Sequence, residues 1–364
     1  MYKYCHGGNA IFEKGNENII DLSANINPLG LSRNVAEAII CEIPNITRYP
    51  DNFSTLLREK TAVYENVNPN WLMFGNGASD IIFRLPRVVG AKKIMLCAPI
   101  FADYERSALS YGAQVVRYTL NKADKLKLDY DFIEAVQAEK PNLVYICNPN
   151  NPTGCLTEFD LIKRLLDSCK EVGSWLVVDE CFMDFCVRAD EYTSKPLLRD
   201  YPNLIIIKAF TKTFALPGVR LGYAICADED IIRRLYFHGA DWSVSNLSQA
   251  AGLAALDESE NYMKRSVEYA AKERAIMEKT LDLLGFTTFE SAANYVFFQN
   301  PFPLDLCKEL DKMGIRIRPC SNYHGLDDMY YRVAVSTKNN NTKFLDAIGT
   351  VLRRYSHINE VTEC

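Results

Sequence analysis

The chain has 364 residues, of which 48% are hydrophobic and 24% are charged, values typical of a globular protein long enough for one large domain and a smaller one. Its formal net charge of -5 gives no positive field that would attract nucleic acid or an anionic membrane, so we expect neither as a partner. The first residues are polar and the longest apolar runs have the length of strands, which predicts no signal peptide, no spanning helix and a cytoplasmic protein.

The cysteines and histidines show no spacing typical of a metal site. The 12 cysteines are scattered without a C-x-x-C pair, and Cys97, Cys147 and Cys226 fall within apolar runs. We expect reduced and partly buried thiols there. The 4 histidines form no H-x-H or H-x-x-x-H pair, so the sequence predicts no catalytic metal.

Short apolar runs recur in the first two thirds of the chain, with helix-like stretches between many of them. They cover residues 92–98, 114–120, 142–147, 175–178, 203–207 and 220–226. The clearest helix is expected over residues 159–172. Its apolar face is formed by residues at helical spacing, namely Leu161, Leu165, Cys169 and Val172. This alternation predicts an α/β domain with a mainly parallel central sheet.

The pattern changes after about residue 259. We expect a long charged helix, a strand, a shorter helix and another strand at residues 260–284, 296–299, 304–313 and 331–336. The asparagines at residues 339–341 are expected to form a loop. The predicted division is an N-terminal arm belonging to the small domain, a large domain, and a smaller α+β C-terminal domain, at residues 1–30, 31–258 and 259–364.

Polar residues follow several of the apolar runs, at the edge of a parallel sheet where ligands bind. The run ending at Cys147 leads into a turn rich in asparagine and proline, where the amide of Asn151 could point into the crevice. The run ending at Val178 leads into Asp179, a carboxylate that needs a cationic or hydrogen-bonding partner if it is buried. Taken alone, each has a simpler explanation: a turn for Asn151, and a helix cap or a salt bridge for Asp179.

Two further segments carry groups that could bind an anion or a carbonyl compound. Gly77, Ala78 and Ser79 precede an apolar run, so their amides and the Ser79 hydroxyl could cap a helix and hold a phosphate. Lys212 follows another apolar run, with Arg220 eight residues further on. Its amine could form a Schiff base if neighbouring cations depress its pKa, although a lone lysine after a strand is more often a surface charge.

Together these segments resemble the fold type I enzymes of the aminotransferase class I and II family, over nearly the whole chain. The resemblance implies the PLP-dependent transferase fold, pyridoxal 5′-phosphate as cofactor, and a homodimer with a shared active site. It implies that Lys212 binds the cofactor covalently, that Asp179 pairs with its ring nitrogen and that Asn151 binds its ring hydroxyl. The residues implied to hold its phosphate are Gly77, Ala78, Ser79, Thr211 and Arg220. Phe101 would stack on the ring, and Tyr49 would reach the neighbouring subunit's cofactor.

The chain departs from many members of this family at two positions. Phe182 stands where many have tyrosine, and Ala209 where many have serine or threonine, so one hydrogen bond to the ring oxygen and one phosphate ligand are missing. Phe182 is also a clue, because within the family the closer resemblance is to the threonine-phosphate decarboxylases, which make aminopropanol phosphate for cobalamin. The segments that carry this closer resemblance are residues 6–9, 23–30, 179–185, 242–244 and 318–326.

The closer resemblance implies a small phosphorylated amino acid as substrate, either threonine phosphate or serine phosphate, and therefore two anion sites. Arg332 matches the arginine that grips the carboxylate, and Asn25 could add a hydrogen bond. Arg318 and His6 would bind the phosphate. His6 is explained equally well as a surface residue of the N-terminal arm.

Three alternatives remain open from the sequence. Histidinol-phosphate aminotransferase would use the same Lys212, Asp179 and Asn151, but it would hold the Cα–H bond rather than the carboxylate bond perpendicular to the cofactor ring. It must also admit an imidazole and, in its second half-reaction, a keto acid. A non-catalytic regulatory module with this fold would need a DNA-binding domain, for which we expect no room in the polar N-terminal arm. A nucleotide-dependent Rossmann enzyme is disfavoured, since Asp80 breaks the glycine pattern.

Overall fold

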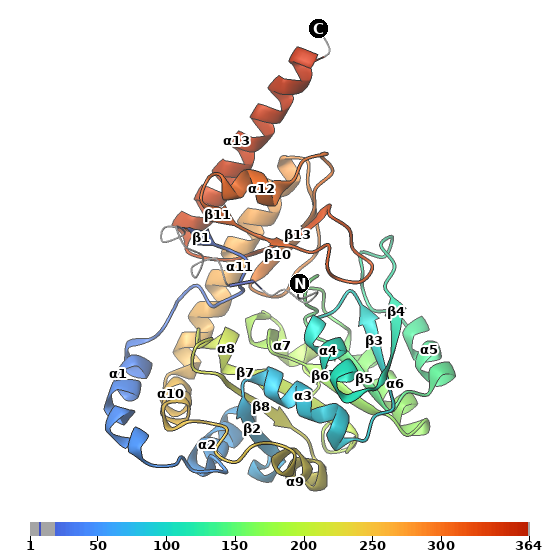
Figure 1. Ribbon diagram of the computed structural model, residues 1–364, viewed down its shortest axis with the longest axis vertical. Coiled ribbons are helices and arrows are strands. Elements are labelled where there is room, and N and C mark those ends of the chain that lie inside the picture. Colours follow the sequence, from blue (N-terminus) through green and yellow to red (C-terminus); the bar gives the residue numbers. More distant parts are fainter. Residues whose placement is uncertain (1–6, 9–18, 363–364) are drawn as a thin grey trace.

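A computed structural model describes residues 7–8 and 19–362 of the chain (Figure 1). A seven-stranded sheet with its helices fills the lower part of the molecule in that view, and two smaller sheets lie above it. The long helix α11 (Ser259–Leu283) runs along both parts. None of the helices in the described ranges is long and apolar enough to cross a membrane.

The large sheet is mainly parallel. From one edge to the other its strands are β2 (Leu72–Asn76), β8 (Leu221–Ile225), β7 (Leu204–Ala209), β6 (Trp175–Asp179), β5 (Leu143–Cys147), β3 (Lys93–Ala98) and β4 (Gln114–Thr119). The pairs from β7 to β4 are parallel, whereas β8 is antiparallel to both β7 and β2. Each predicted apolar run overlaps one of these strands, which confirms the α/β fold with a mainly parallel sheet.

The sequence does not predict β2. Its apolar part is short, and it ends in Gly75 and Asn76, residue types that are depleted in strands. Pairing with β8 stabilises it, with Gly75 opposite Gly222. A Cβ atom on Gly222 would come within 2.4 Å of the Ala78 nitrogen, so glycine at this position lets the chain after β2 pass close over β8.

Helices cover the large sheet. They are α1 (Arg33–Glu42), α2 (Thr55–Glu65), α3 (Ala78–Val88), α4 (Ala102–Tyr111), α5 (Asp131–Glu139), α6 (Phe159–Glu171), α7 (Ala189–Tyr192), α8 (Phe210–Thr213), α9 (Glu229–Phe237) and α10 (Asn246–Asp257). The helix predicted at residues 159–172 is α6, and its predicted apolar residues Leu161, Leu165 and Cys169 are buried. Cys97, Cys147 and Cys226 are buried free thiols, as predicted.

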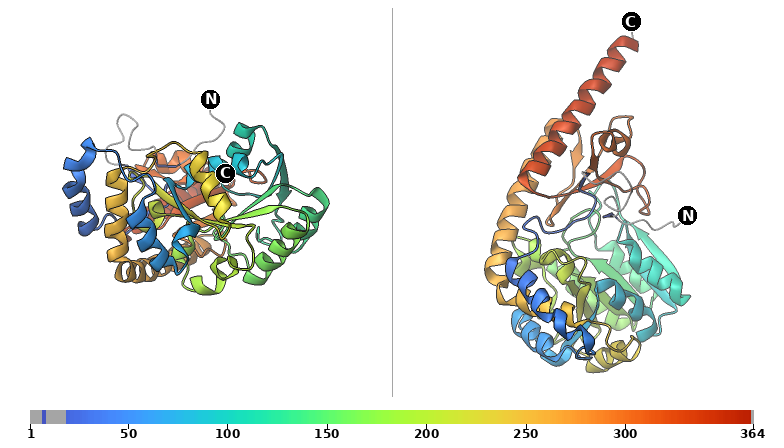
Figure 2. Two further views of the ribbon diagram at one scale, coloured as in Figure 1. Left: turned by 90° about the horizontal axis from the view of Figure 1, so that it is seen from below. Right: turned by 60° about the vertical axis from the view of Figure 1, so that its left-hand side comes forward.

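The second part of the chain is built on two small sheets. One is antiparallel, in the order β12 (Arg318–Pro319), β13 (Tyr330–Ala334), β10 (Tyr295–Gln299) and β9 (Thr287–Thr288), and the other pairs β1 (Ile20–Asp21) with β11 (Ile315–Arg316). The pairing of β1 brings the N-terminal segment into this part. The helices here are α12 (Leu306–Asp311) and α13 (Lys338–Thr362), which projects from the body (Figure 1 and Figure 2).

The prediction of a loop at residues 339–341 is wrong, because these asparagines lie in the first turn of α13. Asn341 is buried, and its Oδ1 accepts a hydrogen bond from the Ser336 backbone N–H at 2.9 Å. Its Nδ2 donates to Glu273 Oε2 at 2.9 Å. Asparagine favours loops where its side chain competes with the backbone, but here tertiary partners hold the side chain at the start of a helix.

A cluster of buried charges joins the helices and strands around β7. Lys208 Nζ, on β7, lies 2.9 Å from Glu65 Oε1 at the end of α2 and 2.7 Å from Asp184 Oδ1 in the 3-10 turn η4 (Met183–Phe185). Lys195 Nζ lies 2.8 Å from Glu65 Oε2, and the hydroxyl of Tyr223 donates to Glu65 Oε1. Lys195 and Lys208 thus face Glu65 and Asp184, and each carboxylate is in contact with at least one lysine.

Replacing Glu65 by glutamine is expected to destabilise the fold by about 3–5 kcal/mol near neutral pH, because it removes the carboxylate shared by Lys208 and Lys195 and leaves Asp184 as the one carboxylate in contact with the buried Lys208 ammonium. Although burial opposes ionisation, Lys208 and Lys195 lower the pKa of Glu65 from 4.5 to about 2. A carboxyl group with a lowered pKa stabilises the fold above its unfolded pKa and loses that contribution as the pH falls. The difference between the two proteins in urea unfolding should therefore shrink between pH 4.5 and about 2. A difference that stays constant across this range would contradict the assignment.

Candidate active site

A cavity of about 260 Å³ lies between the carboxyl ends of the large-sheet strands and the antiparallel sheet. The predicted site residues that line it are Asn25, Ala78, Ser79, Phe101, Asn151, Asp179, Thr211, Lys212, Arg220, Arg318 and Arg332. Gly77 lies directly beside the lining, since a Cβ atom there would come 2.5 Å from Arg220 Nη2. Tyr49 does not line the cavity, and His6 lies outside the described residues. The structure thus brings residues from most of the chain to one place.

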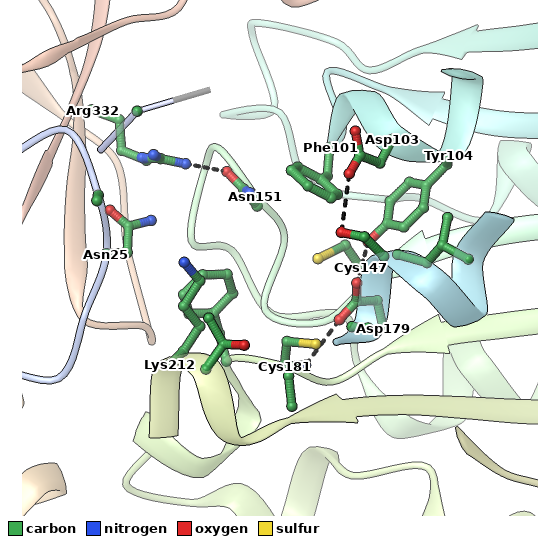
Figure 3. A pocket seen from close by; sticks show the side chains of 18 of the residues that line it. Asn25, Phe101, Asp103, Tyr104, Cys147, Asn151, Asp179, Cys181, Lys212 and Arg332 are labelled. Carbon is green, nitrogen blue, oxygen red and sulfur yellow. Dashed lines mark hydrogen bonds between the residues drawn. The ribbon is translucent and has the colours of Figure 1, made fainter. Parts of the chain in front are cut away.

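Lys212 lies on α8, the single helical turn that follows β7, where the sequence predicts a short turn. Figure 3 shows its amine pointing into the space between Asn25 and Arg332 on one side and Asp179 on the other. Burial lowers its pKa from 10.5 to about 8, and the nearby Arg332 and Arg220 contribute in the same direction. The amine of Lys212 is therefore closer to its neutral, nucleophilic form near neutral pH than an exposed lysine is.

We expect the amine of Lys212 to lose its proton near pH 8 in protein freed of bound ligands. Reductive methylation followed by peptide mass spectrometry gives the reactivity of this lysine against pH, with N-acetyl-lysine as the reference compound. The reactivity of Lys212 should rise at a lower pH than the reactivity of N-acetyl-lysine. In Arg332→Met this rise should move back towards higher pH, because a neighbouring cation has been removed. A wild-type profile that coincides with the reference would contradict this assignment.

Asp179 lies at the carboxyl end of β6 and is buried. Its Oδ1 accepts a hydrogen bond from the Cys181 backbone N–H at 2.9 Å, and its Oδ2 accepts one from the Tyr104 hydroxyl at 2.6 Å. Burial raises its pKa, and within the described part of the chain Asp179 forms no ion pair. A buried carboxylate held by neutral donors is suited to accept from a cationic N–H of a ligand in the cavity.

The start of α3 presents hydrogen-bond donors to the cavity. Gly77 precedes the helix with φ 81°, a conformation that glycine adopts without strain, and the first N–H groups of α3 lie at the cavity. Arg220 lies beside this turn and has φ 59°, a left-handed conformation that is costly for arginine. The Ser79 hydroxyl donates to Asp103 Oδ2 at 3.2 Å. A helix N-terminus with a guanidinium group beside it is suited to bind a phosphate.

A second group of cationic side chains lies on the antiparallel sheet. Arg318 on β12 and Arg332 on β13 stand opposite one another in the register, and both are buried. Arg332 donates from Nη1 to Asn151 Oδ1 and from Nη2 to the Ser23 carbonyl at 2.9 Å. Its Nε atom and Asn25 Oδ1 are buried without a hydrogen-bond partner. These unsatisfied atoms indicate a ligand site, because buried polar groups are normally paired.

Arg318 donates from Nη2 to Asn322 Oδ1 at 3.0 Å, and its guanidinium lies 5.6 Å from the centre of the Tyr323 ring. Asn322 and Tyr323 lie in the loop after β12, so this loop holds Arg318 at the cavity. Arg318 and Arg332 together with Lys212 bring three basic side chains to this end of the cavity. It is suited to a ligand with more than one negative charge.

Several lining residues are not predicted from the sequence, among them Asp103, Tyr104, Cys147, Cys181 and Tyr323. Tyr104 is the most consequential, because it donates to Asp179 and stacks on Tyr145 with ring centres 4.8 Å apart. On an amphipathic helix an aromatic residue looks like core, and no local pattern distinguishes it. Only the spatial closeness of α4 to the end of β6 reveals the contact.

The two departures from the family pattern lie in the cavity wall, where Phe182 and Ala209 both line the space. Phe182 packs edge-on against Tyr295, with ring centres 5.2 Å apart. The hydroxyl of Tyr295 donates to the Asn150 carbonyl at 2.7 Å, so it does not replace the hydroxyl that a tyrosine at position 182 would supply. Tyr49 is 78% exposed and stacks on Trp242, with ring centres 4.3 Å apart.

Comparison with known proteins places these features in context. The model of the family "Aminotransferase class I and II" matches residues 17–348. The chain is 33% identical to threonine-phosphate decarboxylase of Salmonella typhimurium over 359 residues, which is 97% of this chain and 98% of that protein. The crystal structure of histidinol-phosphate aminotransferase from Clostridium acetobutylicum matches with a TM-score of 0.86 and 31% identity, covering 92% of this chain and 100% of that one.

A further solved structure bears on the fold alone. It is histidinol-phosphate aminotransferase from Sinorhizobium meliloti in complex with pyridoxal-5′-phosphate, at 21% identity. Its TM-score is 0.83, and the match covers 91% of this chain and 90% of that one.

Proposed function

The chain belongs to the aminotransferase class I and II family, and we propose that it is a pyridoxal-5′-phosphate-dependent lyase that decarboxylates L-threonine O-3-phosphate to 1-amino-2-propanol phosphate. The observation that carries the proposal is the pair Arg318 and Arg332, which share one cavity with Lys212. A substrate with both a carboxylate and a phosphate matches this pair of guanidinium groups. Similarity to threonine-phosphate decarboxylase over nearly the full length of both chains supports the reaction, and hence a place in cobalamin biosynthesis.

Pyridoxal 5′-phosphate fits the residues at the cavity. Its phosphate suits the start of α3, with Gly77, Ala78, Ser79, Thr211 and Arg220 as the residues that would hold it. When bound, the cofactor supplies an electron sink for the bond that breaks at the substrate's Cα.

The ring of the cofactor suits the middle of the cavity. Asp179 is the buried carboxylate that would face the ring nitrogen, and Phe101 lies in the wall where it would stack. Asn151 would donate to the ring oxygen from its Nδ2, because its Oδ1 already accepts from Arg332. Phe182 offers no second donor to that oxygen, so Asn151 would be the main one.

Arg332 would bind the substrate carboxylate, since its buried Nε–H lacks a partner, and the Nδ2 of Asn25 would add a hydrogen bond. Arg318 would bind the substrate phosphate, and we assign His6 to the same group. Arginine suits both anions because its planar guanidinium donates two parallel hydrogen bonds. Lys212, or a water molecule beside it, would return a proton to Cα after the carboxylate has left.

The chain's own residues would select the reaction by orienting the substrate. Decarboxylation needs the bond from Cα to the carboxylate to lie perpendicular to the cofactor ring, whereas transamination needs the Cα–H bond there. Arg332 sits on β13, across the cavity from Asp179, and would set the direction of the carboxylate. The reaction would therefore be decided at the two arginines rather than at Lys212.

Histidinol-phosphate aminotransferase is the second candidate, favoured by the close structural match to such an enzyme. One assay separates the two. Release of carbon dioxide from threonine phosphate with no keto acid present is the expected result, with serine phosphate as a second substrate to be compared. Turnover of histidinol phosphate that requires 2-oxoglutarate, with no carbon dioxide released, would contradict the proposal.

We also propose that the enzyme is a cytoplasmic homodimer with a shared site. Exposed apolar side chains gather in the segments at residues 31–63 and 237–242, and Tyr49 among them would reach the partner's cofactor.

The domain division proposed is residues 1–30 and 259–364 for the small domain and 31–258 for the large one. Separate clusters of buried apolar side chains around the large and the small sheets support it. Free thiols at the described cysteines suit a reducing compartment.

A further inference from the structure

The segment that carries Lys212 is held at both ends by one carboxylate. Asp184 Oδ1 lies 2.7 Å from Lys208 Nζ, four residues before Lys212. Asp184 Oδ2 accepts a hydrogen bond at 3.1 Å from the hydroxyl of Thr213, the residue directly after Lys212. Lys208 and Thr213 are both almost fully buried, and the side chain of Asp184 is 16% exposed.

Asp184 belongs to the same stretch of chain that presents Asp179. Asp179 ends β6, and Asp184 lies five residues further on in η4. In the parallel pairing of β6 with β7, Asp179 stands opposite Ile207, one residue before Lys208. The contacts of Asp184 therefore tie the segment that ends in Asp179 to the segment that carries Lys212, and none of the three residues that make them lines the cavity.

The segment around Lys212 needs such support. The helix α8 has only four residues, too few to be stable by itself in water. Shortly after it the chain passes through Ala215 with φ 55°, a strained left-handed conformation for a residue other than glycine. Thr213 is held a second time through its carbonyl, which accepts from Asn27 Nδ2 at 2.7 Å. Both bonds act on the residue next to the amine.

We propose that Asp184 is a positioning residue that fixes the amine of Lys212 relative to the carboxylate of Asp179. The inference rests on the proposed function, because that function requires the amine and the carboxylate to meet opposite ends of one cofactor. Asp184 does not line the cavity, and it would act through Lys208 and Thr213. Errors of about 1 Å in the placement of a catalytic group can cost on the order of a hundredfold in rate.

The test uses Thr213→Val, which removes the donor to Asp184 with little change in side-chain shape and no change in charge. We expect kcat to fall by roughly tenfold to a hundredfold. KM should change little, since Arg318 and Arg332 are untouched. The pH midpoint of the visible absorbance of the lysine-bound cofactor should also shift, because the surroundings of the amine change. Thr213→Ser keeps the hydroxyl and should restore both kcat and the midpoint.

Lys195→Met is the matched control. It removes an ion pair of the same buried cluster through Glu65, but it leaves both contacts of Asp184 intact. It should lower the temperature of unfolding and leave the absorbance midpoint in place. Asp184→Asn is a second variant, measured in the same way in case Thr213→Val does not fold, and it should also shift the midpoint.

Two results would overturn the proposal. One is a coloured Thr213→Val or Asp184→Asn protein whose absorbance titrates as the wild type does. The other is a Lys195→Met protein whose midpoint moves as far as that of Thr213→Val, which would make the cluster a general stabiliser only. A wild-type protein without visible absorbance would instead refute the proposed function, and with it the role of Asp184.

Discussion

Replacing Lys212 by alanine is expected to abolish turnover while the protein stays folded. The loss of proton transfer to Cα alone should cost about 10²–10⁴-fold in rate. The loss of covalent attachment to the cofactor adds to this. Stability should change little or increase, because the variant removes a buried amine whose pKa is lowered by burial and by two nearby arginines.

The measurement combines turnover with the visible absorbance of the purified protein. Wild type should be coloured, and Lys212→Ala should lose the absorbance that depends on attachment to the lysine. Lys163→Ala, an exposed lysine on α6, is the control and should behave as wild type. Retained absorbance and turnover in Lys212→Ala would show that another amine binds the cofactor.

Arg318→Gln and Arg332→Gln are expected to separate the two anion sites. Leaving one anionic group of the substrate without its buried cationic partner should cost about 3 kcal/mol, roughly two orders of magnitude in kcat/KM. With threonine phosphate both variants should lose this amount. With L-threonine, which has no phosphate, Arg318→Gln should lose little beyond the already poor wild-type rate, whereas Arg332→Gln should lose activity on both substrates.

Comparison of the two substrates in each variant is the measurement that checks this. The two arginines stand opposite one another on neighbouring strands, and the proposal assigns them to different ends of the substrate. Equal losses of Arg318→Gln on threonine phosphate and on L-threonine would show that Arg318 does not bind the phosphate. Arginine should not be replaceable by lysine at either position, since a lysine offers no planar fork.

The strands of the large sheet could be predicted because each is a compact apolar run bounded by polar residues. β2 could not, since its short apolar part ends in Gly75 and Asn76 and its strand character comes from pairing with β8. The error at residues 339–341 has the same origin. Side-chain partners such as those of Asn341 come from distant segments, and they override the local preference of asparagine for loops.

The site residues divide in the same way, into those that a local sequence pattern predicts and those that tertiary packing brings together. Lys212, Asp179 and Asn151 each follow a recognisable apolar run, so their place at the strand ends could be predicted. The contact of Tyr104 with Asp179, and the closeness of Arg318 to Arg332, depend on packing and on strand register. No spacing in the sequence encodes either contact.

The central claim is that the bond from Cα to the carboxylate breaks, rather than the Cα–H bond. Turnover of threonine phosphate in deuterium oxide, without any keto acid, tests it most directly by mass spectrometry of the product. The account predicts 1-amino-2-propanol phosphate that keeps its original Cα hydrogen and carries one deuterium from solvent at the same carbon. Loss of the original hydrogen, or a keto product in place of the amine, would contradict the account.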